Sequence, residues 1–141
     1  MRSKSLYFII ALILLGRVHA QFKITEFLAR NENSITDEDS EKSDWIEITN
    51  TTAEAFNIGG WHLTDNKSIL NKWTFPSLDV PPQSRLIVFA SGKNRSLGDK
   101  ELHTNFMLDS NGEYLALVKP DGKTINSCLL YTSDAADELT S

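Results

Sequence analysis

The sequence predicts an all-β protein whose seven to eight short strands form a β-sandwich. Three observations support this prediction. After residue 20, apolar residues alternate with polar ones over short stretches, helical periodicity is hard to find, and turn-forming residues separate the stretches. The chain has 141 residues, which allows one domain of ordinary size, and its 40% of hydrophobic residues suffices for a packed core.

Residues 1–20 have the pattern of a signal peptide. Basic residues precede an apolar run over residues 6–15, which is too short to span a membrane. Residues 18–20 follow as Val-His-Ala, with small side chains at the −3 and −1 positions. We therefore expect cleavage between Ala20 and Gln21, and a secreted, extracellular or cell-envelope location without a stable membrane span. An uncleaved N-terminal anchor is the alternative.

Charge and cysteine content exclude several classes of function. The chain carries 14 basic and 19 acidic residues, and removal of a signal peptide with three basic residues leaves 11 against 19, a net charge of −8. Such a chain is repelled by phosphate backbones, so we expect no nucleic-acid partner. Its single cysteine excludes an intramolecular disulfide framework and a cysteine-based zinc cluster.

The first strands follow directly after the expected cleavage site. Phe22, Ile24 and Leu28 alternate with polar residues, which predicts a half-buried strand with these three side chains on one face. Residues 31–43 are polar and acidic without an apolar period, which predicts a long loop. Residues 45–49 alternate again, with both isoleucines on one face, and predict the second strand.

The next stretch contains a change of parity at a pair of glycines, Gly59-Gly60. Phe56 and Ile58 precede the glycines with one parity, whereas Trp61 and Leu63 follow with the other. In a regular strand this change would send half of the apolar side chains into water. We therefore expect a β-bulge at the glycines that restores the register.

The remaining strands are separated by clear turn signals. They are expected at residues 73–75, 85–90, 102–108, 114–118 and 123–127. Residues 85–90 are apolar on both faces, which predicts a central strand. The Lys-Pro-Asp-Gly sequence at residues 119–122 is typical of a hairpin turn, since proline presets φ and glycine accepts a positive φ.

Six sequence motifs, in order, resemble the lamin tail domain family. They lie at residues 24–29, 44–50, 59–65, 72–76, 102–106 and 112–117, and an Asp-Gly pair follows at 121–122. The resemblance covers residues 22–127 and implies an immunoglobulin-like sandwich, in the form found in bacterial exported proteins. It also implies a binding or tethering role without catalysis, near the N-terminus of chains that can carry further modules such as kinase-like domains.

The last residues do not fit the strand pattern of this family. We therefore place the domain at residues 21–127 and expect residues 128–141 to be an unstructured tail. The sequence of this tail resembles a translated sequencing-adapter read-through, in which case Cys128 would be foreign. A genuine C-terminal extension is the alternative.

Acidic residues crowd the loop after the first strand. They are Asp37, Glu38, Asp39, Glu41 and Asp44. Calcium takes six to eight oxygen ligands, and carboxylates of a loop can supply several. The spacing, however, lacks the central glycine and terminal glutamate of a helix-flanked calcium loop. A solvated acidic loop is therefore favoured, calcium stays open, and we assign no metal and no cofactor.

Histidine and tryptophan residues are the other candidates. His62 and His103 lie within strand motifs, and no nucleophile with a nearby acid is recognisable by spacing, so structural roles are favoured over catalysis. Trp61 and Trp73 are assigned to the core. Trp45 has opposite parity to its isoleucine neighbours and is the better candidate for an exposed aromatic platform, although packing is favoured there too.

The sequence thus predicts a non-catalytic, exported interaction or tethering module, expected at the N-terminus of a larger secreted or cell-surface protein. Its partner would be another protein or a cell surface. No catalytic, cofactor-binding or metal-binding residues are assigned. The alternative is an accessory domain of an extracellular enzyme, kinase-like or hydrolase, whose catalytic part is missing from this chain. A calcium-dependent carbohydrate module that uses the acidic loop and Trp45 is a third hypothesis.

Overall fold

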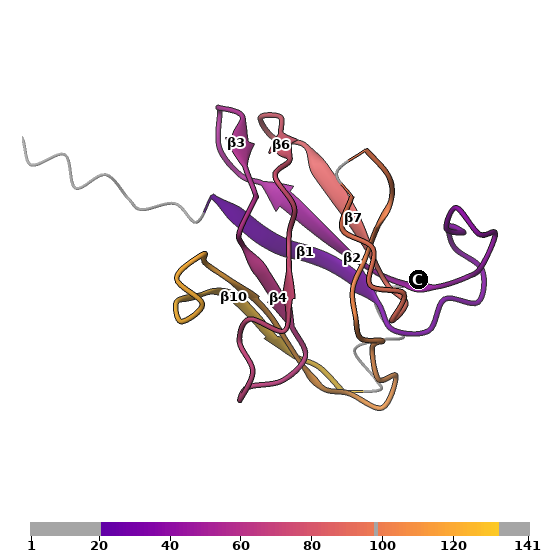
Figure 1. Cartoon of the computed structure of the whole chain (residues 1–141). Coiled ribbons are helices and arrows are strands. Elements are labelled where there is room, and N and C mark those ends of the chain that lie inside the picture. The colour runs from indigo at the N-terminus through magenta and orange to yellow at the C-terminus, as the bar shows by residue number, and fades with distance from the viewer. Residues whose placement is uncertain (1–20, 98, 133–141) are drawn as a thin grey trace, which may run out of the picture.

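The computed structural model describes residues 21–97 and 99–132, which form ten β-strands and no helix (Figure 1). The strands are β1 (Phe22–Leu28), β2 (Asp44–Asn50), β3 (Phe56–Asn57), β4 (His62–Thr64), β5 (Trp73–Thr74), β6 (Asp79–Val80), β7 (Arg85–Ala90), β8 (Leu102–His103), β9 (Tyr114–Val118) and β10 (Ile125–Leu130). The prediction of an all-β sandwich is confirmed. The signal peptide proposed for residues 1–20 lies outside the described residues, as does the end of the tail.

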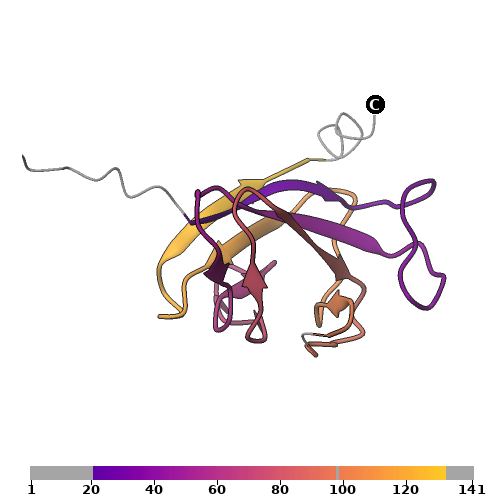
Figure 2. The ribbon, with the colours of Figure 1, turned by 90° about the horizontal axis from the view of Figure 1, so that it is seen from above.

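Two four-stranded sheets form the sandwich. One has the order β1-β2-β7-β8 and the other the order β10-β9-β4-β5. All neighbours within these sheets are antiparallel except β7 and β8, which are parallel. A separate two-stranded sheet pairs β3 with β6 and lies at the upper end of the molecule in Figure 1. The crossing of the two main sheets is visible from above in Figure 2.

Aliphatic and aromatic side chains from both main sheets fill one core. Among the residues with no exposed surface are Phe22, Ile46, Ile48, Leu63, Val88, Leu115 and Leu117. The ring of Phe22 meets Trp61 edge-on, with 5.1 Å between ring centroids. Trp61 and Trp73 are both buried, as predicted, so they contribute apolar surface to folding and do not form an exposed platform.

The register of β1 differs from the predicted alternation. A β-bulge lies between Ile24 and Glu26 in the pairing of β1 with β2. The additional residue turns Phe27 into the main core together with Ile24, and it places Leu28 in a second apolar cluster. The expectation that Leu28 shares a face with Phe22 and Ile24 was therefore wrong, because a bulge shifts the parity of every later residue.

The predicted bulge at Gly59-Gly60 was also wrong. β3 and β4 on either side of the glycines belong to different sheets, so the parity change marks a change of sheet. Trp61 N–H donates to the Ile58 carbonyl at 3.1 Å, which closes a turn there. Gly60 has φ of +81°, a conformation that L-residues with a Cβ rarely adopt.

Two predictions for the middle of the chain had different outcomes. β7 lies between β2 and β8, with Val88 in the main core and Phe89 in the second cluster, which confirms the central strand. The strand expected at residues 102–108 is shorter, because only Leu102–His103 pairs with β7. Thr104 N–H still donates to the Phe89 carbonyl of β7 at 2.8 Å, and the Thr104 hydroxyl then donates to the Phe106 carbonyl at 2.7 Å, where the chain leaves the regular ladder.

The two sheets meet along β1 and β10, where side chains provide the bonds between strands. Ile24 N–H donates to Ser127 Oγ at 3.3 Å, and the Asn126 amide donates to the Phe22 carbonyl. Each strand has a register shift at this place, between Ile24 and Glu26 and between Ile125 and Ser127. The bulges bend both strands, and side chains then satisfy polar backbone groups that a continuous ladder would have paired.

The C-terminal boundary differs from the expected one. β10 continues past residue 127 to Leu130, so residues 128–130 pair with β9 and are not an unstructured tail. Tyr131 is buried, its ring lies 4.4 Å from that of Phe27, and its hydroxyl donates to Glu113 at 3.2 Å. Gly112, with φ of +106°, passes so close to the Tyr131 carbonyl that a Cβ there would overlap it.

Replacement of Tyr131 tests whether this segment belongs to the domain. Tyr131→Ala should lower the free energy of unfolding by about 3 kcal/mol, because it removes a buried ring from the core. Leu130→Ala is the matched control, since Leu130 is 72% exposed, and should cost about 0.5 kcal/mol or less. Chemical denaturation measures both values. Equal, small losses for the two variants would show that the core ends before residue 128.

Candidate functional site

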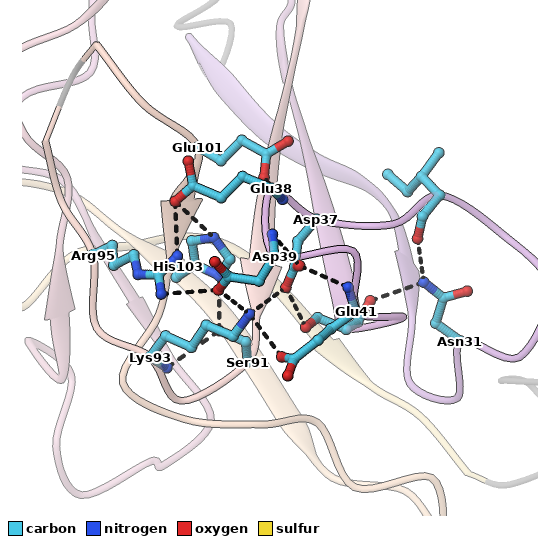
Figure 3. A network of polar contacts seen from close by, with 12 residues as sticks. Asn31, Asp37, Glu38, Asp39, Glu41, Ser91, Lys93, Arg95, Glu101 and His103 are labelled. Carbon is cyan, nitrogen blue, oxygen red and sulfur yellow. Dashed lines mark hydrogen bonds and ion pairs between the residues drawn. The ribbon is translucent and has the colours of Figure 1, made fainter.

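Two loops meet at one end of the β1-β2-β7-β8 sheet. The first, residues 31–43, joins β1 to β2, and the second, residues 91–101, joins β7 to β8. β2 and β7 are antiparallel neighbours in which Asp44 lies opposite Ala90. The start of β2 therefore lies beside the end of β7, and this pairing brings the acidic loop against a segment that carries Lys93 and Arg95 (Figure 3).

Lys93 is the centre of the contact between the two loops. Its ammonium nitrogen lies 2.7 Å from an oxygen of Asp37, 2.7 Å from one of Asp39 and 2.8 Å from one of Glu41. An ammonium group has three N–H donors, and three carboxylates surround it here. Burial alone would lower the pKa of Lys93, but the hydrogen bonds to these carboxylates outweigh it and raise the pKa above its ordinary value.

Asp37 is the buried member of the cluster, and its side chain has no exposed surface. One carboxylate oxygen accepts from the backbone N–H groups of Asp39 and Glu41, both at 3.0 Å, and the other accepts from Ser43 Oγ at 2.7 Å and from Lys93. Burial opposes ionisation of Asp37. The bonds from Lys93 and Ser43 outweigh that effect and hold its pKa well below the usual range.

This geometry resembles a metal site whose centre is taken by a lysine. Oxygens of Asp37, Asp39 and Glu41 lie within 4.8 Å of one another, as they would around a cation. The Lys93 ammonium bonds to all three, so calcium would have to displace a buried ion pair before it could bind. Lys93, from the loop between β7 and β8, is thus the counter-ion of the acidic loop. The favoured expectation of a solvated acidic loop was incomplete, because it did not include this lysine.

The other two acidic candidates have separate partners. Glu38 pairs with Arg95 at 2.8 Å, and the same guanidinium also reaches Asp39 at 2.9 Å. Asp44 accepts from the Asn31 backbone N–H at 3.3 Å, and burial raises its pKa. The Arg95 pairs are partly exposed, where solvent screens the attraction between the charges, so Lys93 contributes more to holding the loop than Arg95 does.

His103 lies behind this cluster, fully buried, with its ring stacked on Phe89 at 5.3 Å between centroids. Nδ1 lies 2.8 Å from Ser91 Oγ, which already accepts from the Lys93 backbone N–H at 3.2 Å. Nε2 has no hydrogen-bond partner, and Glu38 Oε1 lies 3.9 Å away.

The Ser91–His103–Glu38 sequence of contacts resembles a hydrolase triad only in its residue types. A nucleophilic serine must be accessible to its substrate. An open cleft of 710 Å³ adjoins the cluster, and neither Ser91 nor His103 lines it. The lining residues are Glu38, Asp39, Asn94, Arg95, Ser96, Leu97 and Lys100. Charged and polar side chains thus dominate the lining, and Leu97 is its apolar member.

The remaining sequence candidates lie elsewhere. His62 is on β4, in the other main sheet from His103, and its Nδ1 lies 2.8 Å from Thr74 Oγ1. Burial lowers its pKa. Trp45 is buried with Leu28 and Phe89 in the second apolar cluster, so it packs against neighbouring strands and offers no platform for stacking. A site that combines His62 with His103 and an exposed platform at Trp45 therefore have no geometric basis in this structure.

Sequence reasoning found the acidic side of the cluster and missed its basic side. Lys93, Arg95 and Ser91 lie between the strands predicted at residues 85–90 and 102–108, where the sequence indicates no candidate site. Their proximity to the acids follows from the pairing of β2 with β7, which local patterns do not specify. One signal was available: two antiparallel neighbours with loops of opposite charge at the same end are expected to form ion pairs there.

The two packed, largely antiparallel sheets define a domain of the immunoglobulin-like β-sandwich class. A model of the lamin tail domain family matches residues 19–131, which is most of the chain, so this protein belongs to the lamin tail domain family. Domains of this family are immunoglobulin-like and non-catalytic, and they are often involved in protein interaction. The match extends past residue 127 to Tyr131, in agreement with the extent of β10.

Two further findings concern relatives of the chain and membrane-spanning helices. A search of curated proteins found no match to the chain. Among the residues that the structure describes, no helix has the length and apolar character needed to cross a membrane.

Removal of the lysine ammonium tests its role as counter-ion. Lys93→Met should lower the free energy of unfolding by about 3 kcal/mol, because Asp37 would be left as an unpaired buried charge. The variant should also gain a calcium-dependent rise in melting temperature, whereas melts of the unmodified protein in calcium and in chelator should coincide. Lys23→Met, at an exposed position of β1, is the control. A calcium response of the unmodified protein would contradict this assignment.

The buried histidine predicts a pH dependence of stability. Burial, followed by the charge of Lys93, lowers the pKa of His103 below 6.5. The unfolded chain then binds more protons than the folded one below pH 6.5, so the stabilisation is complete above that pH and is lost as the pH falls toward the folded pKa. His103→Gln should flatten the slope of unfolding free energy against pH between about 5 and 7. An unchanged slope would contradict a depressed pKa.

Proposed function

We propose that this protein is a non-catalytic, exported module that binds or tethers another protein or a cell surface. The observation that carries the proposal is the 710 Å³ cleft between two loops that Lys93 and Arg95 hold together at one end of the sandwich. A binding site benefits from loops that are already ordered, because less conformational entropy is lost on association. The family's frequent role in protein interaction supports the same conclusion.

Export is proposed from the sequence of residues 1–20. A basic start, a short apolar run and small residues before Gln21 are typical of a cleaved signal peptide. The mature net charge of −8 suits a soluble surface module and disfavours nucleic acid as the partner. In a larger secreted or cell-surface protein, such a domain would attach the remaining chain to its partner.

One experiment on the expressed chain tests export and interaction together. A photo-crosslinking amino acid is placed at Lys100, on the cleft, and in a control at Glu54, which is exposed in the loop between β2 and β3. Mass spectrometry of the chain recovered outside the cytoplasm should give Gln21 as its first residue. Irradiation of the source cells should yield a discrete crosslinked product from position 100 and none from position 54. A retained leader would contradict export, and the absence of products from both positions would contradict the interaction role.

A further inference from the structure

We propose that Gln21, once the leader has been removed, closes its side chain on its own α-amino group and becomes pyroglutamate. This inference rests on the export proposed above, because only cleavage between Ala20 and Gln21 gives Gln21 a free amine. It adds a covalent modification site at the start of β1, a place that the interaction function does not use.

The reaction needs only atoms of Gln21 itself. The lone pair of the neutral α-amine attacks Cδ of the side-chain amide, the bond between Cδ and Nε2 breaks, and Nε2 leaves as ammonia with one proton from the amine. The product is a five-membered lactam, and nothing is oxidised or reduced. Both reacting groups belong to one residue, which raises their effective concentration. An α-amine also gives up its proton more readily than a lysine ammonium, so part of it is neutral at neutral pH.

The contacts that anchor Gln21 leave the reacting atoms available. Its carbonyl accepts from the Thr51 N–H at 3.0 Å and lies 3.5 Å from the Thr51 hydroxyl, beside the pair that Phe22 forms with Asn50. Ring closure uses the α-nitrogen, Cα and the side chain, so it breaks neither contact. Gln21 is partly exposed, and among the described residues none bonds to its side-chain amide. The lactam can therefore form on the folded domain.

Phe22 gives this modification a structural consequence. Its side chain has no exposed surface, its ring meets Trp61 edge-on, and its carbonyl accepts from the Asn126 amide at the seam between β1 and β10. An aminopeptidase that removed Gln21 would reach this core residue next, and loss of a large core side chain is strongly destabilising. Aminopeptidases begin at a free α-amine, which the lactam does not have. Pyroglutamate at position 21 thus protects the first strand of the sandwich outside the cell.

The modification site and the cleft lie at opposite ends of β1. Gln21 precedes the strand, whereas the acidic loop that supplies Glu38 and Asp39 to the cleft follows its other end (Figure 1). A strand of this length separates its two ends by roughly 20 Å. Ring closure at Gln21 therefore changes no residue that lines the cleft, and the modification can be tested separately from the interaction.

The test is peptide mass spectrometry of the full chain recovered outside the source cells. The N-terminal peptide should begin at Gln21 and be lighter than the unmodified peptide by the mass of one ammonia molecule. N-terminal sequencing should be blocked until pyroglutamyl aminopeptidase has removed residue 21, and should then begin at Phe22. Gln21→Asn is the matched variant, because it keeps the amide but would need a strained four-membered ring. It should show the unmodified mass and a free amine.

Digestion with a general aminopeptidase checks the protective role. The unmodified sequence should keep its mass, whereas Gln21→Asn should lose residue 21, with coincident melting curves before digestion showing that both are folded. Equal trimming of the two chains would overturn the protective role.

The first residue of the exported chain separates the two proposals. A chain that begins with an uncyclised Gln21 and a free amine would overturn this inference and leave export intact. A chain that begins at any other residue would contradict the cleavage site and the modification together. Crosslinking from position 100 should be the same for Gln21→Asn as for the unmodified sequence, so the interaction function is judged independently of either outcome.

Discussion

The pairing of β2 with β7 is the interaction on which the rest of this structure depends. The two strands pair in register from Asp44 opposite Ala90 to Thr49 opposite Arg85. On one face their side chains enter the main core, and on the other Trp45 and Phe89 form the second cluster. The same pairing sets the acidic loop beside Lys93, because loops that precede one strand and follow its antiparallel neighbour lie at the same end of the sheet.

At the candidate site, ion pairs with Lys93 hold the acidic loop, residues 31–43, against the loop between β7 and β8. Burial opposes ionisation of Asp37, and the hydrogen bonds that backbone N–H groups, Ser43 and Lys93 donate to it outweigh that effect. The domain thus orders this acidic loop with a lysine of its own β7–β8 loop.

The predictions that agree with the structure are those that depend on residues close together in the chain. The strands at residues 45–49, 85–90 and 114–118 could be predicted because alternation and apolar runs report burial directly. The hairpin turn before β10 could be predicted from its proline and glycine, and Gly122 indeed has a positive φ. Errors arose at the bulge in β1 and at Gly59-Gly60, since a parity change has the same appearance whether a strand bulges or changes sheets.

By itself the sequence determined the all-β class, most of the strands, the burial of Trp61 and Trp73, the acidic loop and the family. These features depend on local patterns or on motifs that lie within a few residues. Only the tertiary structure decided that Lys93 fills the acidic loop, that Tyr131 completes the core and that the His103 ring lies buried behind Glu38. Each of these contacts joins residues far apart in the chain, and strand pairing, which no local pattern encodes, brings them together.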